Sequence, residues 1–226
     1  VPPTTNTVFN EVPDNSIYAE FGSYYIDLRN NEEELWNNIH SKHKNSIRKA
    51  LKNKISVKYG KKYKDLAYKL ISDTFKRSHK KYMTKKLFDN LIDNLEENIQ
   101  IFIAFNNDQP QGCAVIPYSK YSAYYSHGGS IPKPSPGSLN YLHWYVINYL
   151  KNSNIHYYDF VGARINPQKG SKLEGIQRFK KRFGTHMKKG YIWKYPYNNL
   201  KYNIYSLGFK ILKDKKGDII DQENKK

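Results

Sequence analysis

The stretch YYDFVGARINPQKGSKLEGIQRFKKRFG, residues 157–184, has the pattern of a strand, a glycine-rich connection and a helix. The large apolar residues of the helical part recur at the spacing of one helix face: Leu173, Ile176, Phe179 and Phe183. This spacing predicts a helix that packs on a core. Because an α-helix turns by about 100° per residue, Lys180 falls on the same face. This places a cation on a face that is predicted to be apolar, and its position there needs an explanation.

Outward from this stretch, the chain alternates between predicted strands and helices. Hydrophobic periodicity predicts strands at residues 23–29, 55–60, 155–163 and 185–196, and three strands in a meander between residues 99 and 130. It predicts helices at residues 30–54, 63–79, 84–98, 138–154 and 198–214, with Ser138 as an N-cap. We therefore expect an α/β (α+β) fold, with a single domain at residues 23–212 whose mixed, centrally antiparallel sheet is flanked by helices. The remaining segments are an N-terminal extension, 1–22, and a polar basic tail, 213–226.

Positive charge is the strongest global signal. The 226 residues include 38 Lys and Arg against 20 Asp and Glu, a formal net charge of +18. The charge is concentrated locally: residues 41–54 hold six basic residues and no acidic one, and residues 164–194 hold ten basic residues and one acid. Such a field attracts nucleic acid, nucleotide-sugars or anionic lipid head groups. The codon bias of an AT-rich genome explains the total equally well, but not its local concentration.

Several protein classes are disfavoured by composition. The chain has no run of about 18 apolar residues, so we expect no membrane span. Residues 1–13 lack the basic and apolar regions of a signal peptide, and the absence of an initial Met indicates a trimmed or processed chain. Cys113 is the single cysteine, so no internal disulfide can form. We therefore expect a cytoplasmic protein.

Two glycine-containing segments are candidates for binding an anion. QPQGCA, residues 109–114, matches the Gln-x-x-Gly-x-Ala pattern that holds coenzyme A, but that pattern needs a following helix, and AVIPY predicts a strand. We therefore interpret NDQPQG, residues 107–112, as a hairpin turn. The better candidate is HGGSIPKPSPGSLNY, residues 127–141, where Gly128 and Gly129 permit close backbone approach to a cofactor and Lys133 adds charge. An ordinary structured loop is an equal alternative.

Other catalytic patterns are weak. The seven histidines show no metal-ligand spacing, so we predict no metal site. Cys113 lies in a predicted strand and is expected in the core. We find no serine in a glycine-flanked elbow. Asp159 is expected to cap a neighbouring loop rather than to act as a base.

Five stretches together resemble the Fem-type (FemABX) peptidyltransferase family of the GNAT superfamily. They are YYIDLR (24–29), KHKNSIRKALKNKISVKYG (42–60), SAYYSHGGS (122–130), YLHWYVINYLKNSNIHYYDFVG (141–162) and KLEGIQRFKKRFG (172–184). The last resembles the family signature Gly-x-x-x-Phe-Lys-x-x-Phe-Gly. Val161 stands where the family more often has glycine. The resemblance covers roughly residues 24–195, and only one domain is present where family members usually have two.

The resemblance implies aminoacyl transfer from aminoacyl-tRNA to an amine of a cell-wall or surface-glycan precursor. It implies no tightly bound cofactor, and its partners would be tRNA, a nucleotide-linked or lipid-linked glycan precursor, the inner membrane surface as a peripheral contact, and a companion domain or subunit. One alternative is an acyl-CoA-dependent N-acyltransferase that acts on an amino sugar or nucleotide-sugar. A second is a non-catalytic basic module that binds RNA or an anionic surface.

The resemblance also implies roles for individual residues. Lys180, beside Phe179, would stabilise the oxyanion that forms when an amine attacks an ester carbonyl. The alternative is a lysine whose stem covers the edge of the core. Tyr125 would line the acceptor site, or would simply pack on its strand. Lys44 and Arg48, together with Arg164, would bind the acceptor's phosphates; a solvated basic face is the alternative for the first two.

Overall fold

The computed structural model describes residues 9–212 and 217–224. Its tertiary contacts divide the chain into two compact units that interleave along the sequence. The large unit comprises residues 25–160 and 178–186, and the small unit comprises the remainder of the chain. Strand β1 (Ile17–Asp27) and helix α6 (Lys172–Lys181) each begin in the small unit and end in the large one.

The main sheet of the large unit is antiparallel. Its strand order is β2 (Ser56–Tyr59), β3 (Ile99–Asn106), β4 (Gln109–Pro117) and β6 (His127–Ser130). A tight turn joins β3 to β4 through Asn107 and Asp108, whose φ angles of 46° and 60° suit a two-residue hairpin. The predicted hairpin at this position is therefore confirmed, and QPQG begins a strand rather than a helix-capping loop.

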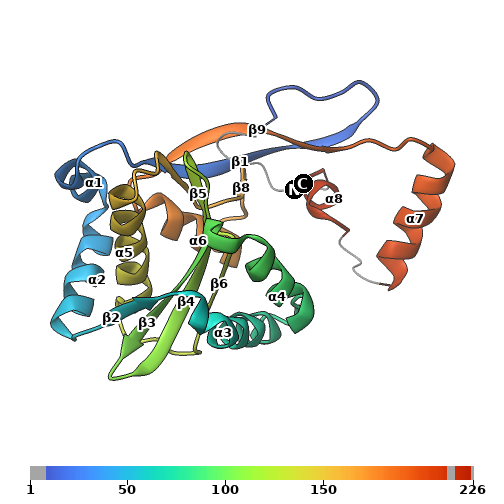
Figure 1. The fold of residues 1–226 in the computed structure, drawn as a ribbon. Coiled ribbons are helices and arrows are strands. Elements are labelled where there is room, and N and C mark those ends of the chain that lie inside the picture. The colour runs from blue at the N-terminus through green and yellow to red at the C-terminus, as the bar shows by residue number, and fades with distance from the viewer. Residues whose placement is uncertain (1–8, 213–216, 225–226) are drawn as a thin grey trace. The chain divides into compact units, whose positions relative to one another are not determined.

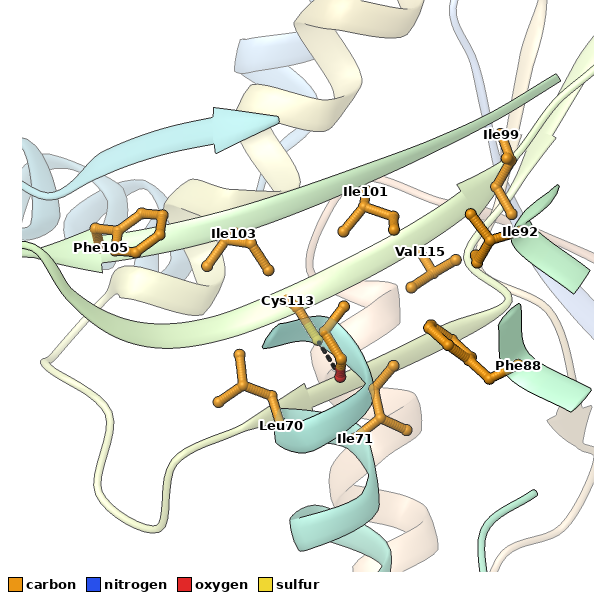
Figure 2. Packing of buried hydrophobic residues seen from close by; sticks show 11 residues of the cluster. Leu70, Ile71, Phe88, Ile92, Ile99, Ile101, Ile103, Phe105, Cys113 and Val115 are labelled. Carbon is orange, nitrogen blue, oxygen red and sulfur yellow. Dashed lines mark hydrogen bonds between the residues drawn. The ribbon is translucent and has the colours of Figure 1, made fainter. Parts of the chain in front are cut away.

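Helices cover both faces of this sheet, because the apolar residues of β3 alternate between them (Figure 1). Ile101 and Ile103 pack with α3 (Lys64–Arg77) and α4 (Lys85–Asn94) in the cluster of Figure 2. On the opposite face, the Phe102 ring lies 5.1 Å from that of Tyr149 on α5 (Ser138–Asn152). Helix α2 (Ser41–Lys52) packs against α5.

Cys113 belongs to the first of these faces. Its thiol donates a hydrogen bond to the Ala67 carbonyl oxygen, 3.8 Å away and dashed in Figure 2. The side chain is buried, which confirms the prediction of a core cysteine. Burial raises the pKa of the thiol to about 12, so Cys113 is inert as a nucleophile at neutral pH.

A second set of strands in the large unit supplies the parallel pairing of a mixed fold. β5 (Ser122–Tyr124) runs parallel to β7 (Tyr157–Asp159), and β7 pairs antiparallel with the end of β1, where Tyr25 faces Asp159. The remaining elements of the unit are short: α1 (Glu32–Asn38) and the 3-10 turns η1 (Lys61–Tyr63) and η2 (Glu96–Asn98). The predicted α/β class is therefore confirmed.

The small unit is built on the first part of β1, which pairs with β8 (Ala163–Arg164) and β9 (His186–Lys194). Gly22 is required here, since a Cβ at that position would lie 2.8 Å from the Lys188 carbonyl oxygen. Helices α7 (Asn199–Leu212) and α8 (Ile219–Glu223) complete the unit. Ion pairs tie α8 to the strands: Arg164 with Glu223 at 2.8 Å, and Lys194 with Asp218 and Asp221 at 2.9 and 2.8 Å.

The prediction of one long helix at residues 30–54 is wrong. An Asn31 capping box starts α1, which ends at Ile39 in an extended conformation. His40 then caps α2, since its Nδ1 accepts from the Lys42 N–H at 3.1 Å. Two local caps thus interrupt a continuous helical pattern.

The predicted three-stranded meander is also wrong. β3 and β4 form as expected, but the third segment divides: β5 joins β7, and only β6 pairs with β4. The division follows from the Tyr125 N–H, which donates to the Asp159 carbonyl oxygen at 2.8 Å and draws the first half toward β7.

Several boundaries shift. The strand predicted at residues 23–29 begins at Ile17, inside the predicted extension, and α8 forms inside the predicted tail. Ser138 is the first helical residue, and Gly137 is the N-cap in a left-handed conformation. The strand predicted at 155–163 breaks at Val161, where φ is 50°. The parts of the extension and tail at residues 1–8, 213–216 and 225–226 lie outside the described residues.

Candidate functional site

A pocket of about 170 Å³ opens in the large unit between the two sheet systems and helix α5. Tyr125, Gly128 and Gly129 form one wall, and His143 of α5 and Phe179 of α6 form another. Since a water molecule occupies about 30 Å³ of liquid, the pocket has room for roughly six waters. It can therefore hold a small acyl or aminoacyl group.

The wall that contains Tyr125 depends on two adjacent glycines. A Cβ at Gly128 would collide with the phenol oxygen of Tyr125, and a Cβ at Gly129 would collide with the Leu70 backbone of α3. Gly128 thus makes room for the phenol, while Gly129 allows the strand to approach the helix. The Tyr125 ring lies edge-on to the His143 ring, with 4.6 Å between centroids. Burial raises the pKa of Tyr125, so its phenol keeps its proton and can donate a hydrogen bond.

The end of α6 is held by the junction between α1 and α2. The His40 N–H donates to the Arg182 carbonyl oxygen at 2.9 Å, and His43 Nε2 donates to the Phe179 carbonyl oxygen at 3.0 Å. Gly184 has a φ of 75°, and a Cβ there would lie 2.8 Å from the Asn38 backbone oxygen. The break between α1 and α2 therefore forms the surface against which the Phe-Lys-x-x-Phe-Gly segment packs.

Lys180 is buried where this segment packs, with 9% of its surface exposed. Its predicted core-facing position is confirmed, but Leu173 and Ile176 of the same predicted stripe are 42% and 43% exposed. The buried side of α6 therefore includes the lysine in place of two apolar residues. A lysine that merely covers the core edge keeps its ammonium in water, which this degree of burial does not fit.

Burial lowers the pKa of Lys180 to about 8, and the negative charge of Asp159 on β7 acts in the opposite direction. Asp159 is itself fully buried. Lys180 is therefore mostly protonated at neutral pH, but it needs only a small change of environment to lose its proton. Such a poised ammonium is a chemical resource in a site of low polarity.

The two neighbouring histidines are neutral. Burial lowers the pKa of His43 to about 4 and that of His143 to about 3. His143 Nδ1 shares a 3.0 Å hydrogen bond with the Tyr158 hydroxyl. Within this cluster the positive charge at pH 7 belongs to Lys180, while His43 and His143 act as neutral packing and hydrogen-bonding groups.

The predicted site residues fall into separate groups. Tyr125, Gly128, Gly129 and Phe179 line the pocket together. Within the described part of the chain, the lining residues include Phe179 but not Lys180, its neighbour in sequence. Lys133 is exposed in the connection that leads from β6 to α5.

The predicted phosphate-binding residues lie elsewhere. Lys44 and Arg48 hold their charges over the Trp36 ring, with 5.9 and 5.6 Å to the centroid. Lys44 also donates to the Asn37 carbonyl oxygen at 3.1 Å. Arg164 belongs to the small unit, where its guanidinium contacts Glu223 at 2.8 Å and Gln222 at 2.7 Å. Arg164 would have to leave these partners to bind a phosphate.

Sequence reasoning missed His43 and His143. His143 lies within the apolar run YLHWYV, and a lone polar residue on a buried helix face was the available signal. His43 is hidden in a basic segment where it resembles one more surface charge. Thr74, which also lines the pocket, accepts a 3.0 Å hydrogen bond from the Ser130 N–H, and the sequence carries no signal for it.

Across the described residues, no group of three or more His, Cys, Asp and Glu side chains is arranged to hold a metal ion. The same part of the chain contains no helix with both the length and the apolar character to cross a bilayer.

No protein-family model and no curated protein sequence matches the chain. Solved structures do match. FemX superposes with a TM-score of 0.70 at 16% identity, over 81% of this chain and 63% of its own. The C-terminal domain of a protein described as a lysylphosphatidylglycerol synthetase from Agrobacterium fabrum gives a TM-score of 0.60 at 11% identity, over 90% and 69%.

A third structure, L-PGS from Bacillus licheniformis, gives a TM-score of 0.57 at 10% identity, over 83% of this chain and 65% of its own. The chain thus spans less than two thirds of FemX and of L-PGS. At these identities the likeness concerns the fold: the chain has a Fem-type fold, as its motifs led us to expect.

Proposed function

We propose that this protein is a Fem-type aminoacyltransferase, which moves an aminoacyl group from aminoacyl-tRNA to an amine of a cell-wall or surface-glycan precursor. The observation that carries the proposal is the buried, poised Lys180 in the Phe-Lys-x-x-Phe-Gly segment, directly after the pocket-lining Phe179. The Fem-type fold supports it, since FemX superposes on 81% of this chain with a TM-score of 0.70.

The reaction needs no covalent enzyme intermediate. The acceptor amine attacks the ester carbonyl of the donor, and a C–N bond forms while negative charge develops on the carbonyl oxygen. The C–O ester bond then breaks, and the proton released by the amine is transferred to the departing ribose oxygen. A buried ammonium near the carbonyl lowers the barrier, because its charge is strongest where water is excluded.

Two features favour aminoacyl-tRNA over acyl-CoA as the donor. The segment that matches the coenzyme A pattern forms strand β4, so it offers no helix N-terminus to a pyrophosphate. The net charge of +18 suits a polyanion as large as tRNA. An acyl-CoA-dependent N-acyltransferase remains the second candidate, supported by the small pocket, which fits either type of group.

The acceptor's phosphates would bind on α2. Trp36 holds Lys44 and Arg48 near one another and limits the freedom of both side chains. A phosphate that binds there meets two cations whose conformational entropy is already reduced. Arg164 is the weaker candidate for this role because Glu223 already engages its guanidinium.

The test supplies the purified chain with labelled aminoacyl-tRNAs or acyl-CoAs, together with amine-bearing nucleotide-linked precursors, and measures amide formation. We expect product from an aminoacyl-tRNA and none from acyl-CoA. Product from acyl-CoA alone would favour the second candidate. Binding of RNA or anionic surfaces without turnover of any donor would favour a non-catalytic module.

A further inference from the structure

Helix α7 in the small unit exposes four large aliphatic side chains. Leu200, Ile204, Leu207 and Ile211 are 71%, 65%, 62% and 68% exposed. A Cβ at Gly208 would meet no atom within 4 Å. In the helices of the large unit most large apolar residues are buried, and Leu51 of α2 and Leu87 of α4 are exceptions.

These four residues form one stripe. Their spacing of four, three and four residues places them within an arc of about 60° on a helix that turns 100° per residue. Tyr202 lies on the other side of the helix, and there the Lys194 ammonium sits 5.4 Å from its ring centroid. One side of α7 therefore contacts its own unit, while the apolar stripe faces away from that contact.

The chemistry around the stripe is cationic and aromatic. Within the described part of the segment, residues 195–212 contain two lysines and no acidic residue. Tyr197 precedes the helix and is 95% exposed, with its ring 5.2 Å from that of Tyr195. Lys201, one residue beyond Leu200, is exposed beside the stripe. An apolar stripe with lysine and tyrosine next to it is the composition of helices that lie in the head-group region of a membrane.

We propose that α7 docks this protein on an anionic phospholipid surface, with its apolar stripe inserted among the acyl chains and Lys201 at the head groups. The positive charge of the chain favours an anionic membrane over a second copy of the chain as the partner of α7. Two copies facing each other through α7 would bring together two molecules that each carry a net charge of +18. An anionic bilayer would instead attract the positively charged chain. The proposal goes beyond the proposed function and does not depend on the donor or on catalysis.

The test uses vesicles of phosphatidylcholine with and without phosphatidylglycerol, and measures co-sedimentation of the intact chain. The critical variant is Ile204→Ser/Leu207→Ser, which removes apolar surface and leaves the charge unchanged. The control is Leu51→Ser/Leu87→Ser, since both leucines are exposed in the large unit, at 51% and 58%. Melting curves establish that both variants are folded.

We expect the wild-type chain to bind the anionic vesicles, and the α7 variant to bind them at least about tenfold more weakly. The control variant should bind like the wild type. Equal binding by the α7 variant would overturn the proposal, because attraction by net charge alone would then account for the result. A wild-type dimer in light scattering that the α7 variant abolishes, without vesicle binding, would assign the stripe to a second copy instead.

Discussion

At the scale of the residue, Lys180 carries the chemical argument. If its ammonium stabilises an oxyanion, Lys180→Met should lower kcat about a hundred- to thousandfold, as the removal of one oxyanion donor does. The KM for the donor should change little, because the ground-state carbonyl carries little charge. Steady-state kinetics with one aminoacyl-tRNA measures both parameters.

Lys181→Met is the matched control, since Lys181 is exposed on the same helix. It should retain near-wild-type kcat. Melting temperatures of both variants separate catalysis from folding, since Lys180 also balances the charge of buried Asp159. A folded Lys180→Met enzyme with unchanged kcat would end the catalytic interpretation.

The titration of Lys180 gives a pH prediction with opposite signs for activity and stability. Its pKa is about 8 in the folded chain, against 10.5 for an ordinary lysine. Below pH 8 the side chain is charged in both the folded and the unfolded state, so the full penalty of burying a charge applies. Between pH 8 and 10.5 only the unfolded chain keeps the proton, so this group's contribution to the free energy of unfolding rises with pH.

Activity should instead fall as the pH rises through 8, because the ammonium is lost. The pH profile of kcat tests this prediction about activity. Denaturant unfolding of wild type and Lys180→Met across the same pH range tests the prediction about stability. The difference in free energy of unfolding between the two proteins should shift in favour of the wild type as the pH rises. A difference in free energy of unfolding that does not change with pH would contradict the pKa assigned to Lys180.

Val161 offers a prediction about backbone strain. Its φ of 50° lies in the left-handed region, which is costly for a β-branched residue. Glycine, which the family resemblance leads us to expect at this position, carries no such cost. Val161→Gly should stabilise the protein by about 1 kcal/mol, the relief of strain exceeding the added flexibility of the unfolded chain.

Calorimetry should then show a melting temperature higher by about 2–4 °C. The matched substitution Val57→Gly, in strand β2, should lower the melting temperature, since it removes a residue suited to a strand and relieves no strain. A loss of stability in Val161→Gly would show that the valine side chain contributes more than its backbone costs.

At the scale of the element, the two glycines of β6 have distinct tasks. Gly129→Ala sets a Cβ against the rigid backbone of α3, so it should destabilise the protein by about 1–3 kcal/mol. Gly128→Ala sets a Cβ against the Tyr125 phenol, a side chain that can move. It should cost less stability, but should displace Tyr125 from the pocket and reduce turnover.

Thermal melts and kinetics on the pair distinguish the two effects. We expect the larger drop in melting temperature from Gly129→Ala, and the larger loss of kcat per degree of lost stability from Gly128→Ala. If both variants lose activity only in proportion to stability, Tyr125 has no part in the site.

At the scale of the whole molecule, the net charge of +18 makes a prediction about tRNA. Binding that neutralises phosphates releases counterions, so affinity should fall about tenfold or more between about 50 and 200 mM salt. Lys49→Gln/Lys52→Gln on α2 should reduce the slope of log affinity against log salt by about 0.7–0.9 for each phosphate that is no longer neutralised.

The control is Lys76→Gln/Lys86→Gln, which removes two exposed lysines from α3 and α4. Fluorescence anisotropy with labelled tRNA measures all three proteins. An equal change of slope in the two variants would indicate a diffuse electrostatic attraction with no preferred face.

The sequence alone determined most of the large elements and the fold class. The nearly continuous apolar runs at residues 99–105 and 113–117, and the amphipathic helices at residues 63–98, are local patterns, and the hairpin and helices that they predict are present. The same local reasoning placed Lys180 on the inner side of α6, and correctly rejected a cofactor loop at residues 109–114.

Only the tertiary structure decided how the pieces meet at the pocket. Residues 30–54 carry one helical pattern, and the break at Ile39 follows from caps and from the long-range bond between His40 and Arg182. The division of the third meander strand follows from Asp159, and the exposure of Leu173 and Ile176 follows from what packs on α6. Periodicity reports which residues share a face, but a face becomes core only where another element covers it, and that depends on packing between residues far apart in sequence.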